Sequence, residues 1–256
     1  MLSNDRALAE SFGADADQYD RARPSYPDEL VDELVARSPG RAVLDVGCGT
    51  GIASRLFAER GCLVLGVEPD PRMAAVARRH GIDVEEATFE HWDAADRTFD
   101  LVTCAQAWHW VDPARGAEKA AAVLAPGGLI GLFWNEGSYG PALTPVLRAV
   151  YERHAPALDD YSILLGKGAG DRITGAARAL ASSGRFEEPA ITTYGWERAY
   201  TRDEWLDHLP THSDHRALAA ERLAPLLAEV ANAIDDFEGH LPMQYTAWLV
   251  SAGRLG

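Results

Sequence analysis

Short apolar runs alternate with helical patterns along residues 41–134 of this 256-residue chain. The apolar runs span residues 42–46, 63–67, 84–88, 99–104 and 129–134. Such nearly continuous runs are typical of parallel strands that are buried on both faces. Segments with apolar residues at helical spacing lie between them, at 52–60, 71–80 and 113–124. This alternation predicts an α/β fold with a parallel sheet and right-handed crossovers.

The rest of the chain predicts three further regions around the core at 41–134. Residues 1–40 are expected to form an N-terminal arm, extended at 18–27 because it holds two prolines, and a covering helix at 27–37. Residues 135–185 are expected to form a helical lid, with a turn at 135–140, helices at 141–154 and 172–183, and a glycine-rich loop at 161–170. Residues 186–256 are expected to complete the sheet, with strands at 186–201 and 241–251 and a helix at 216–237.

The charge balance argues against several partners. The chain has 24 basic and 39 acidic residues, a net charge of −15, which disfavours binding to nucleic acid or to an anionic membrane. Its three cysteines form no CxxC pair, and the first residues lack the apolar segment of a signal peptide, so a cytoplasmic location is expected. No metal site is predicted, because Pro210 interrupts the near-helical spacing of His208, His212 and His215. The oligomeric state stays open.

A glycine-rich loop is the most informative motif, with the sequence VLDVGCGTG at residues 43–51. Glycines let the backbone approach a ligand closely, and the N-terminus of the following helix offers free N–H groups. The spacing is G-x-G-x-G rather than the G-x-G-x-x-G of dinucleotide sites, because Ile52 stands where the third glycine is needed. Glu68 ends the second strand and can accept hydrogen bonds from both hydroxyls of a ribose; the alternative is a solvated surface charge.

These segments together resemble the class I S-adenosylmethionine-dependent methyltransferases. The first two motifs of that family are resembled by residues 43–51 and 67–73. The fourth-strand motif is resembled by residues 99–104 together with 108–113, and the turn before the fifth strand by residues 124–128. The resemblance implies a Rossmann-like, seven-stranded, mostly parallel sheet with helices on both faces, a helical lid insertion and an antiparallel last strand pair. A narrower similarity, carried by YDRARPSYP at 19–27 and WHW at 108–110, is to the methyltransferase type 11 subgroup that includes trans-aconitate methyltransferase. That subgroup is heterogeneous in substrate.

The family pattern implies S-adenosylmethionine as the cofactor and S-adenosylhomocysteine as its product. The implied contacts are the loop residues Gly47, Cys48, Gly49 and Gly51 beside the methionine portion, Glu68 at the ribose, Pro69, Met73, Thr88 and Phe89 around the adenine, and Gln106, Tyr19 and Arg23 near the methionine end. Three assignments stay open. Asp45 either reaches the amino group of the methionine portion or holds the loop, and Arg23 either meets a carboxylate or is a surface cation. Phe89 either stacks on the adenine or packs in the core.

The resemblance also implies methyl transfer to an O, N or C atom of a small-molecule acceptor. His109 is the candidate catalytic base, with lining and structural roles as alternatives. The candidate walls of the acceptor pocket are Trp108, Trp110, Trp134 and Tyr139, each of which has core packing as its alternative. A macromolecular acceptor, a non-catalytic binder and a nicotinamide-binding Rossmann-like protein are the competing functions.

Overall fold

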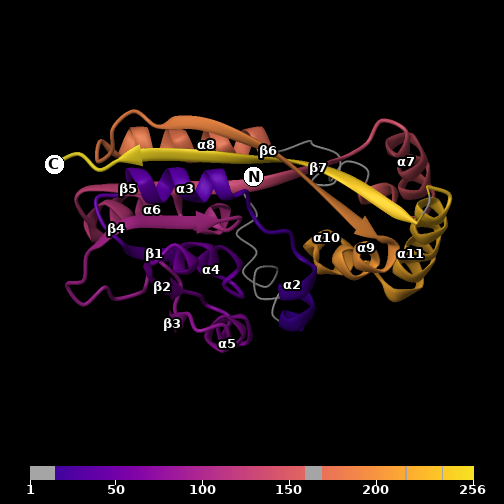
Figure 1. The fold of residues 1–256 in the computed structure, drawn as a ribbon, viewed down its shortest axis with the longest axis horizontal. Helices are drawn as coiled ribbons and strands as arrows, with labels where there is room; N and C mark the ends of the chain where they lie inside the picture. Colours follow the sequence, from indigo (N-terminus) through magenta and orange to yellow (C-terminus); the bar gives the residue numbers. More distant parts are fainter. Residues whose placement is uncertain (1–14, 159–168, 217, 238) are drawn as a thin grey trace.

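A seven-stranded sheet forms the centre of the molecule, a computed structural model that describes residues 15–158, 169–216, 218–237 and 239–256. The strand order is β3-β2-β1-β4-β5-β7-β6 (Figure 1). The strands are β1 Ala42–Val46, β2 Leu63–Val67, β3 Asp83–Glu85, β4 Phe99–Ala105, β5 Leu124–Tyr139, β6 Ala190–Thr201 and β7 His240–Gly253. Strands β1 to β5 are parallel, and β7 runs antiparallel to both β5 and β6. The predicted seven-stranded, mostly parallel α/β sheet is therefore confirmed.

Both faces of the sheet are buried, which explains the uninterrupted apolar runs. Val43 and Leu101 pack on one face with helices α3 (Asp28–Arg37) and α4 (Ile52–Glu59). Leu44 and Val102 pack on the other face with α6 (Pro113–Val123) and α8 (Ala169–Ser183). Helix α5 (Pro71–Arg79) packs beside β3. Successive strand residues point to opposite faces, so a strand covered on both sides needs apolar residues at nearly every position.

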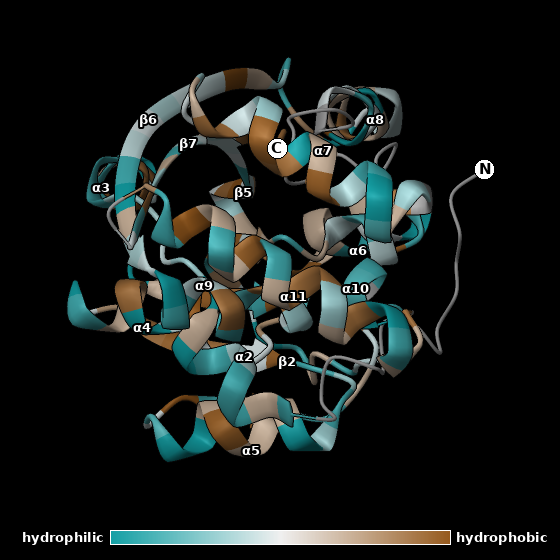
Figure 2. Ribbon diagram, turned by 90° about the vertical axis from the view of Figure 1, so that its right-hand side faces the viewer, coloured by the Kyte–Doolittle hydropathy of each residue, from teal (hydrophilic) through white to brown (hydrophobic). Residues whose placement is uncertain are grey.

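A second helical layer, here called the cap, lies beyond the carboxyl ends of the parallel strands. It consists of α7 (Leu143–His154), α9 (Arg202–His208), the 3₁₀ helix η4 (Leu209–Thr211), α10 (Ser213–Arg216) and α11 (Ala220–Asp235), at the right of Figure 1. Long extensions of β5, β6 and β7 carry these helices, which share a core built around Leu147, Trp205 and Val230. Helix α2 (Ala16–Ala22) lies between α5 and the cap helix α9 (Figure 2).

Several local predictions are wrong. The turn expected at 135–140 is strand, because β7 pairs with β5 as far as Tyr139. Residues 18–22 of the arm expected to be extended at 18–27 belong to helix α2, and only 23–27 are not helical. The helix expected at 216–237 is present but shorter, as α11 at Ala220–Asp235, and Arg216 ends a separate short helix, α10.

The two helices predicted for the lid are confirmed, but they lie in different places. Helix α7 belongs to the cap, whereas α8 covers the sheet beside α6. Residues 161–168 of the predicted glycine-rich loop lie outside the described residues. No helix within the described ranges is long and apolar enough to cross a membrane.

Candidate functional site

The glycine-rich loop joins β1 to α4 at the carboxyl edge of the sheet. Gly47, Gly49 and Gly51 have φ angles of 65°, 57° and 84°, a region that side-chain-bearing residues rarely adopt. Space is also restricted, because a Cβ on Gly47 would lie 2.6 Å from the Cβ of Ala107. The Gly47 N–H donates to the carbonyl of Val67 (2.8 Å), which ties the loop to the end of β2. Conformation and packing therefore both require glycine at position 47.

Glu68 is directed at this loop from the end of β2. The Gly49 N–H donates to its Oε2 (2.9 Å) and the Asp70 N–H to its Oε1 (2.9 Å). The residue is 8% exposed, so it is not a solvated surface charge. Burial raises the pKa of the Glu68 carboxyl to about 7, against the opposing effect of the two backbone donors. The structure thus holds a costly buried acid at the edge of the loop, as functional sites commonly do.

Asp45 lies one layer deeper and is fully buried. Ser54 Oγ donates to its Oδ2 (2.5 Å), and Thr103 Oγ1 donates to its Oδ1 (3.1 Å). Burial raises the pKa of the Asp45 carboxyl to about 6, although both hydroxyl donors favour the charged form. These bonds join β1 to α4 and β4. They favour the interpretation in which Asp45 holds the loop in place.

Arg23 follows α2 and lies between the sheet and the cap. Its Nη2 donates to the carbonyl of Thr211 (2.9 Å), and its guanidinium carbon lies 4.9 Å from the ring centroid of Tyr19. The Nε atom is buried and has no hydrogen-bond partner among the described residues. Arg23 is half-buried and forms no ion pair with a carboxylate among the described residues, which favours a role other than that of a surface cation. A buried donor without a partner suits an anionic ligand.

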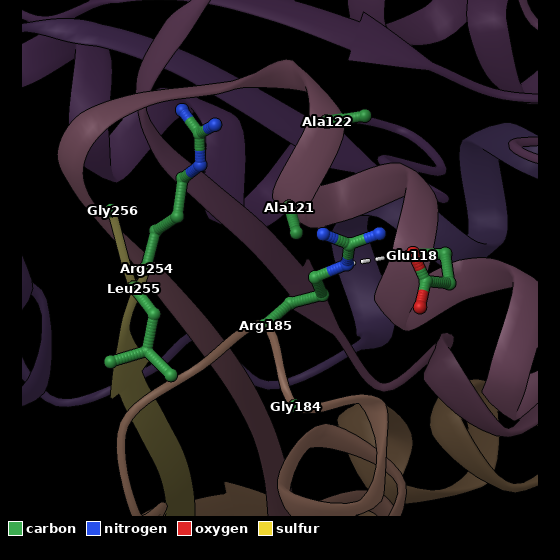
Figure 3. A pocket seen from close by; sticks show the side chains of 8 residues that line it. All are labelled: Glu118, Ala121, Ala122, Gly184, Arg185, Arg254, Leu255 and Gly256. Carbon is green, nitrogen blue, oxygen red and sulfur yellow. Dashed lines mark hydrogen bonds and ion pairs between the residues drawn. The ribbon is translucent and has the colours of Figure 1, made fainter.

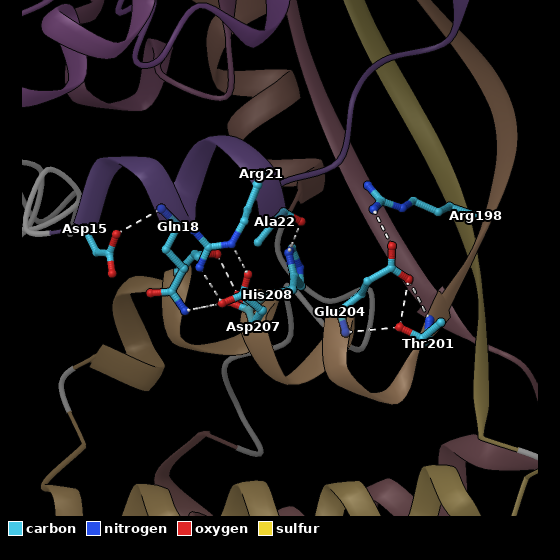
Figure 4. A network of polar contacts seen from close by, with 10 residues as sticks. Asp15, Gln18, Arg21, Ala22, Arg198, Thr201, Glu204, Asp207 and His208 are labelled. Carbon is cyan, nitrogen blue, oxygen red and sulfur yellow. Dashed lines mark hydrogen bonds and ion pairs between the residues drawn. The ribbon is translucent and has the colours of Figure 1, made fainter.

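Helix α2 is fastened on two sides. Asp20 accepts from Arg55 Nη1 (3.0 Å) on α4 and pairs with His80 Nε2 (2.8 Å) next to α5. On the cap side, Arg21 Nε and Gln18 Nε2 donate to Asp207 of α9 at 2.7 and 2.9 Å (Figure 4). Helix α2 therefore links α4 and the end of α5 to the cap helix α9.

Sequence reasoning missed Asn135, which joins three segments near the ends of β4 and β5. Its Nδ2 donates to the carbonyl of Ser25 (2.7 Å), and its Oδ1 accepts from Trp196 Nε1 (3.1 Å). Its backbone carbonyl accepts from Gln106 Nε2 (3.0 Å). Gln106 itself has a φ of 59°, an uncommon value for a residue with a side chain and one often found at functional sites. An isolated asparagine after a predicted strand gives no signal of these long-range contacts.

The residues predicted around the adenine lie close to α2 and the core. Met73 is buried with Ala16 of α2, and Thr88 Oγ1 pairs with His91 Nδ1 (2.8 Å). Phe89 is 3% exposed, and its ring centroid lies 6.3 Å from that of Trp108. Core packing is thus the better supported role of Phe89. Its stacking on adenine stays a prediction, as do the adenine contacts of Met73 and Pro69, the latter exposed beside the loop.

The predicted acceptor residues divide between two cores. Trp108 and Trp134 are buried in the sheet core with α6 and α8, whereas Tyr139 is buried in the cap. His109 stacks obliquely on Trp110, with ring centroids 4.7 Å apart. Burial lowers the pKa of the His109 imidazole to about 3, with a further contribution from Arg172. A neutral ring with so low a pKa is a weak proton acceptor, which favours a lining role over that of the base.

Unsatisfied polar atoms nevertheless remain around these residues. Trp108 Nε1, His109 Nδ1 and Trp134 Nε1 are buried without a hydrogen-bond partner in the part of the chain that the structure describes. Buried polar atoms of native proteins are normally satisfied, so such groups indicate a ligand, water or functional role.

A separate surface pocket of about 230 Å³ lies at the amino ends of the parallel strands (Figure 3). Arg185 and Arg254 line it, but Arg185 pairs with Glu118 (3.1 Å) and Arg254 Nη1 donates to the carbonyl of Leu124 (2.5 Å). This pocket is therefore distinct from the glycine-rich loop. Across the described ranges, no group of three or more His, Cys, Asp or Glu side chains is arranged to hold a metal ion.

Comparison with known proteins shows what this chain is similar to. Residues 44–132 match the family model described as a methyltransferase domain. An uncharacterised methyltransferase of Mycobacterium tuberculosis is 43% identical over 137 residues, covering 53% of this chain and 56% of the relative. A ubiquinone biosynthesis O-methyltransferase of Hahella chejuensis is 39% identical over 107 residues, covering 39% of this chain and 44% of the relative. The matches thus span about half the length of these curated relatives.

A solved structure extends the similarity beyond the matched domain. A protein of Anaeromyxobacter dehalogenans, assigned as a type II methyltransferase, superimposes with a TM-score of 0.68 at 26% identity. The match covers 90% of this chain and 97% of that protein, so it includes the cap as well as the sheet. The narrower similarity to trans-aconitate methyltransferase stays a prediction.

Proposed function

We propose that this chain, which carries a methyltransferase domain of the class I, S-adenosylmethionine-dependent type, transfers the methyl group of that cofactor to an O, N or C atom of a small-molecule acceptor. The observation that carries the proposal is the buried Glu68 carboxylate. It lies at the end of β2, bonded to the backbone of the glycine-rich loop, where an acid can hold the ribose of a nucleoside.

The hydrogen-bonding capacity of Glu68 fits a ribose. A carboxylate offers about four lone-pair sites on its two oxygens. The N–H groups of Gly49 and Asp70 take one on each oxygen, which leaves capacity for two hydroxyl donors. The buried, unpartnered Arg23 Nε offers a matching donor for the carboxylate of the methionine portion. Both ends of the cofactor therefore have chemically suitable partners in this chain.

When bound, the cofactor supplies an electrophilic methyl group on a sulfonium sulfur. The contribution of the chain is mainly position: the loop and Glu68 hold the nucleoside, and α2 covers it from solvent. Holding the acceptor atom about 3 Å from the methyl carbon, in line with the breaking bond, supplies much of the rate acceleration. The unsatisfied atoms of Trp108, His109 and Trp134 support an acceptor contact near the end of β4, with His109 lining that space.

A small acceptor suits the charge and the layout. Nucleic-acid binding relies on neutralising phosphates with lysine and arginine, and this chain has a net charge of −15. The carboxyl edge of the sheet is covered by α2 and the cap, which suits an enclosed ligand better than a broad macromolecular surface.

Binding of S-adenosylhomocysteine and of NAD to wild-type protein, Glu68→Gln and Glu86→Gln tests the cofactor assignment. Glu86 is a matched control, because it is an exposed acid near the same strands and pairs with Arg78 (2.6 Å). A ligand at 100 times its Kd adds about 2.7 kcal/mol of stability, which raises the Tm by roughly 5–10 °C at this chain length.

We expect this rise with S-adenosylhomocysteine in wild type and Glu86→Gln, and a Kd roughly 10–100-fold higher in Glu68→Gln, since hydrogen bonds to charged groups contribute about 1.5–3 kcal/mol. A shift with NAD alone, or equal S-adenosylhomocysteine affinity in Glu68→Gln, would overturn the assignment. Methyl label from the cofactor should appear in the low-molecular-mass fraction of an extract. Label in protein or RNA instead would refute the small acceptor.

A further inference from the structure

Strand β6 forms one edge of the sheet and is long for an edge strand. It spans twelve residues, Ala190–Thr201, whereas β3 at the opposite edge has three. Strand β7 pairs with β6 along its whole length, and α9 packs at its carboxyl end. Among the described strands, none pairs with the outer edge of β6, which follows the rim of the molecule in Figure 2. A long open edge is a template for pairing with a further strand.

The ladder with β7 shows which backbone groups of β6 face outward. The Arg202 N–H donates to the carbonyl of Gly239 (3.2 Å), in the register that pairs β6 with β7. Bonded and non-bonded positions alternate in an antiparallel pair, so the even-numbered residues of β6 bond to β7 and the odd-numbered ones face away. The Thr201 N–H agrees with this, because it donates to the Glu204 side chain (2.8 Å). The other outward-facing residues are all exposed: Ile191, Thr193, Gly195, Glu197 and Ala199.

Strand β6 lacks the features that usually protect an open edge. Such edges are commonly short, or carry proline, lysine or a bulge. The sequence of β6, AITTYGWERAYT, has no proline and no lysine, and its register with β7 is uninterrupted. Its only charged residues are neighbours of opposite sign, Glu197 and Arg198, so the strand is neutral in a chain with a net charge of −15. An identical strand is therefore not repelled by the charge of this edge.

We propose that the outer edge of β6 pairs with β6 of a second copy of this chain, antiparallel to it, about a two-fold axis at Gly195. In such a closed, symmetric pair each surface is its own complement. The outward-facing residues between 191 and 199 then lie opposite one another and exchange about ten backbone hydrogen bonds, a number typical of a protein interface of standard size. One continuous sheet runs through both chains.

The length of the open edge and its charges select the position of the axis. Gly195 is the midpoint of residues 191–199, so an axis there pairs every outward-facing position of that stretch. A shift by one residue towards α9 would involve Thr201, whose N–H already bonds to Glu204. With the axis at Gly195, Glu197 faces the partner's Thr193. An axis at Glu197 would instead oppose two carboxylates, which destabilises a strand pair.

Two half-buried aromatic residues, Tyr194 and Trp196, add side-chain contacts on the face of β6 that packs against α3. Tyr194 Oη donates to Glu33, and Trp196 Nε1 donates to Asn135 Oδ1 (3.1 Å), so both rings are already fixed. In the dimer, Tyr194 of each chain faces the partner's Trp196 at a position without backbone bonds, where facing side chains lie closest. Aromatic pairs are favourable cross-strand contacts, and fixed rings lose little entropy on association.

Sedimentation velocity at about 1–100 μM, with wild-type protein, Gly195→Pro and Gly195→Ala, tests the pairing. Proline removes the N–H of residue 195, and a strand tolerates proline where that group faces solvent, so the ladder with β7 is kept. Apart from its chain neighbours, no atom lies within 4 Å of a Cβ on Gly195, so both substitutions have room. Gly195→Ala keeps the N–H and is the matched control.

We expect wild type and Gly195→Ala to form dimers of similar affinity. In Gly195→Pro the dissociation constant should rise roughly 10–100-fold, because two backbone hydrogen bonds at the axis are lost. Circular dichroism checks that this variant folds. The Tm of wild type should rise with protein concentration, because association stabilises the folded chain, and that of Gly195→Pro should rise less.

Oxidative cross-linking of Gly195→Cys and Thr193→Cys locates the axis. In a bonded antiparallel pair the two Cα atoms are about 5.5 Å apart, which a disulfide can span. In Thr193→Cys the two thiols would be four residues out of register, more than about 13 Å apart. The native residues Cys48, Cys62 and Cys104 are buried and do not compete. We expect a covalent dimer from Gly195→Cys and little from Thr193→Cys on a non-reducing gel.

A monomer at every concentration overturns the proposal, as does an unchanged dissociation constant in folded Gly195→Pro. Should Gly195→Pro not fold, cross-linking decides: equal yields from Gly195→Cys and Thr193→Cys refute the axis. Open-ended oligomers in place of dimers, or an edge occupied by a different protein in place of a second copy, also refute it. These measurements need no cofactor, so their outcome is independent of the function proposed above.

Discussion

Substitution of Asn135 by alanine tests whether one amide joins the arm, β5 and β6. The residue is 8% exposed, and its side chain satisfies the Ser25 carbonyl and the Trp196 Nε1 atom. Alanine removes both bonds. The bond from Gln106 to the backbone carbonyl of residue 135 is retained, so the change is confined to the two side-chain partners.

The expected magnitude follows from those partners. A buried polar group left without its hydrogen bond costs about 1–3 kcal/mol. Ser25 is exposed, so water replaces part of the hydrogen bond that its carbonyl loses, whereas the Trp196 side chain is half-buried. We therefore expect a loss of about 2–4 kcal/mol in the free energy of unfolding, since the two costs add only partly. At about 2–4 °C per kcal/mol for a chain of this size, the Tm should fall by roughly 4–16 °C.

Thermal melting of Asn135→Ala, Asn135→Asp and Ser138→Ala provides the assay. Ser138 is an exposed residue of the same strand, with a long 3.4 Å bond to the carbonyl of Gln244, so its loss should have little effect. Asn135→Asp keeps an acceptor for Trp196 but sets a carboxylate oxygen against the Ser25 carbonyl, and we expect it to be no more stable than Asn135→Ala. A Tm for Asn135→Ala within about 2 °C of Ser138→Ala would refute the reasoning.

Three further predictions concern the site. Because burial raises the Glu68 pKa from 4.5 to about 7, this group stabilises the folded apo protein below pH 4.5, and that contribution is lost as the pH rises towards 7. The affinity for S-adenosylhomocysteine should rise over the same pH interval. Both pH dependences should be smaller in Glu68→Gln, with the affinity measured by titration calorimetry. Gly47→Ala places a Cβ 2.6 Å from Ala107 at a φ of 65°, so the Tm should fall by several degrees and S-adenosylhomocysteine binding should be lost; wild-type affinity would contradict the loop assignment. Burial raises the pKa of the Cys48 and Cys104 thiols, so a thiol reagent should modify them only after unfolding, and rapid labelling of native protein would show the core to be more open.

Local signals account for the parts of the fold that the sequence predicts. Asp70 caps α5 and Asp112 caps α6, each followed by a proline at the first helical position, and both helices begin where expected. The left-handed glycines Gly61 and Gly81 follow the ends of α4 and α5. These features depend on neighbours within a few residues, so they are readable without the tertiary structure.

The failures come from contacts that are distant in sequence. The segment after Trp134 contains asparagine and glycines and has the composition of a turn, but pairing with β7 extends it as strand to Tyr139. Helix α2 has one local signal, since Asp15 accepts from the Gln18 N–H as an N-cap. Its remaining support is the attachment of Asp20 to α4 and of Arg21 to α9, which no pattern within the arm indicates.

The attachments of α2 also show how a ligand can enter a covered site. The pair of Arg21 with Asp207 is largely exposed, at 60% and 30% of the side chains, and exposed ion pairs contribute only about 0–1 kcal/mol. The pair of Asp20 with Arg55 is more buried, at 15% and 26%. Gln18 and Arg23 add hydrogen bonds to Asp207 and to the Thr211 carbonyl on the cap side, so α2 is attached to both layers. A ligand that enters between α2 and the cap must therefore break several bonds together, including the one between the Ala22 carbonyl and His208.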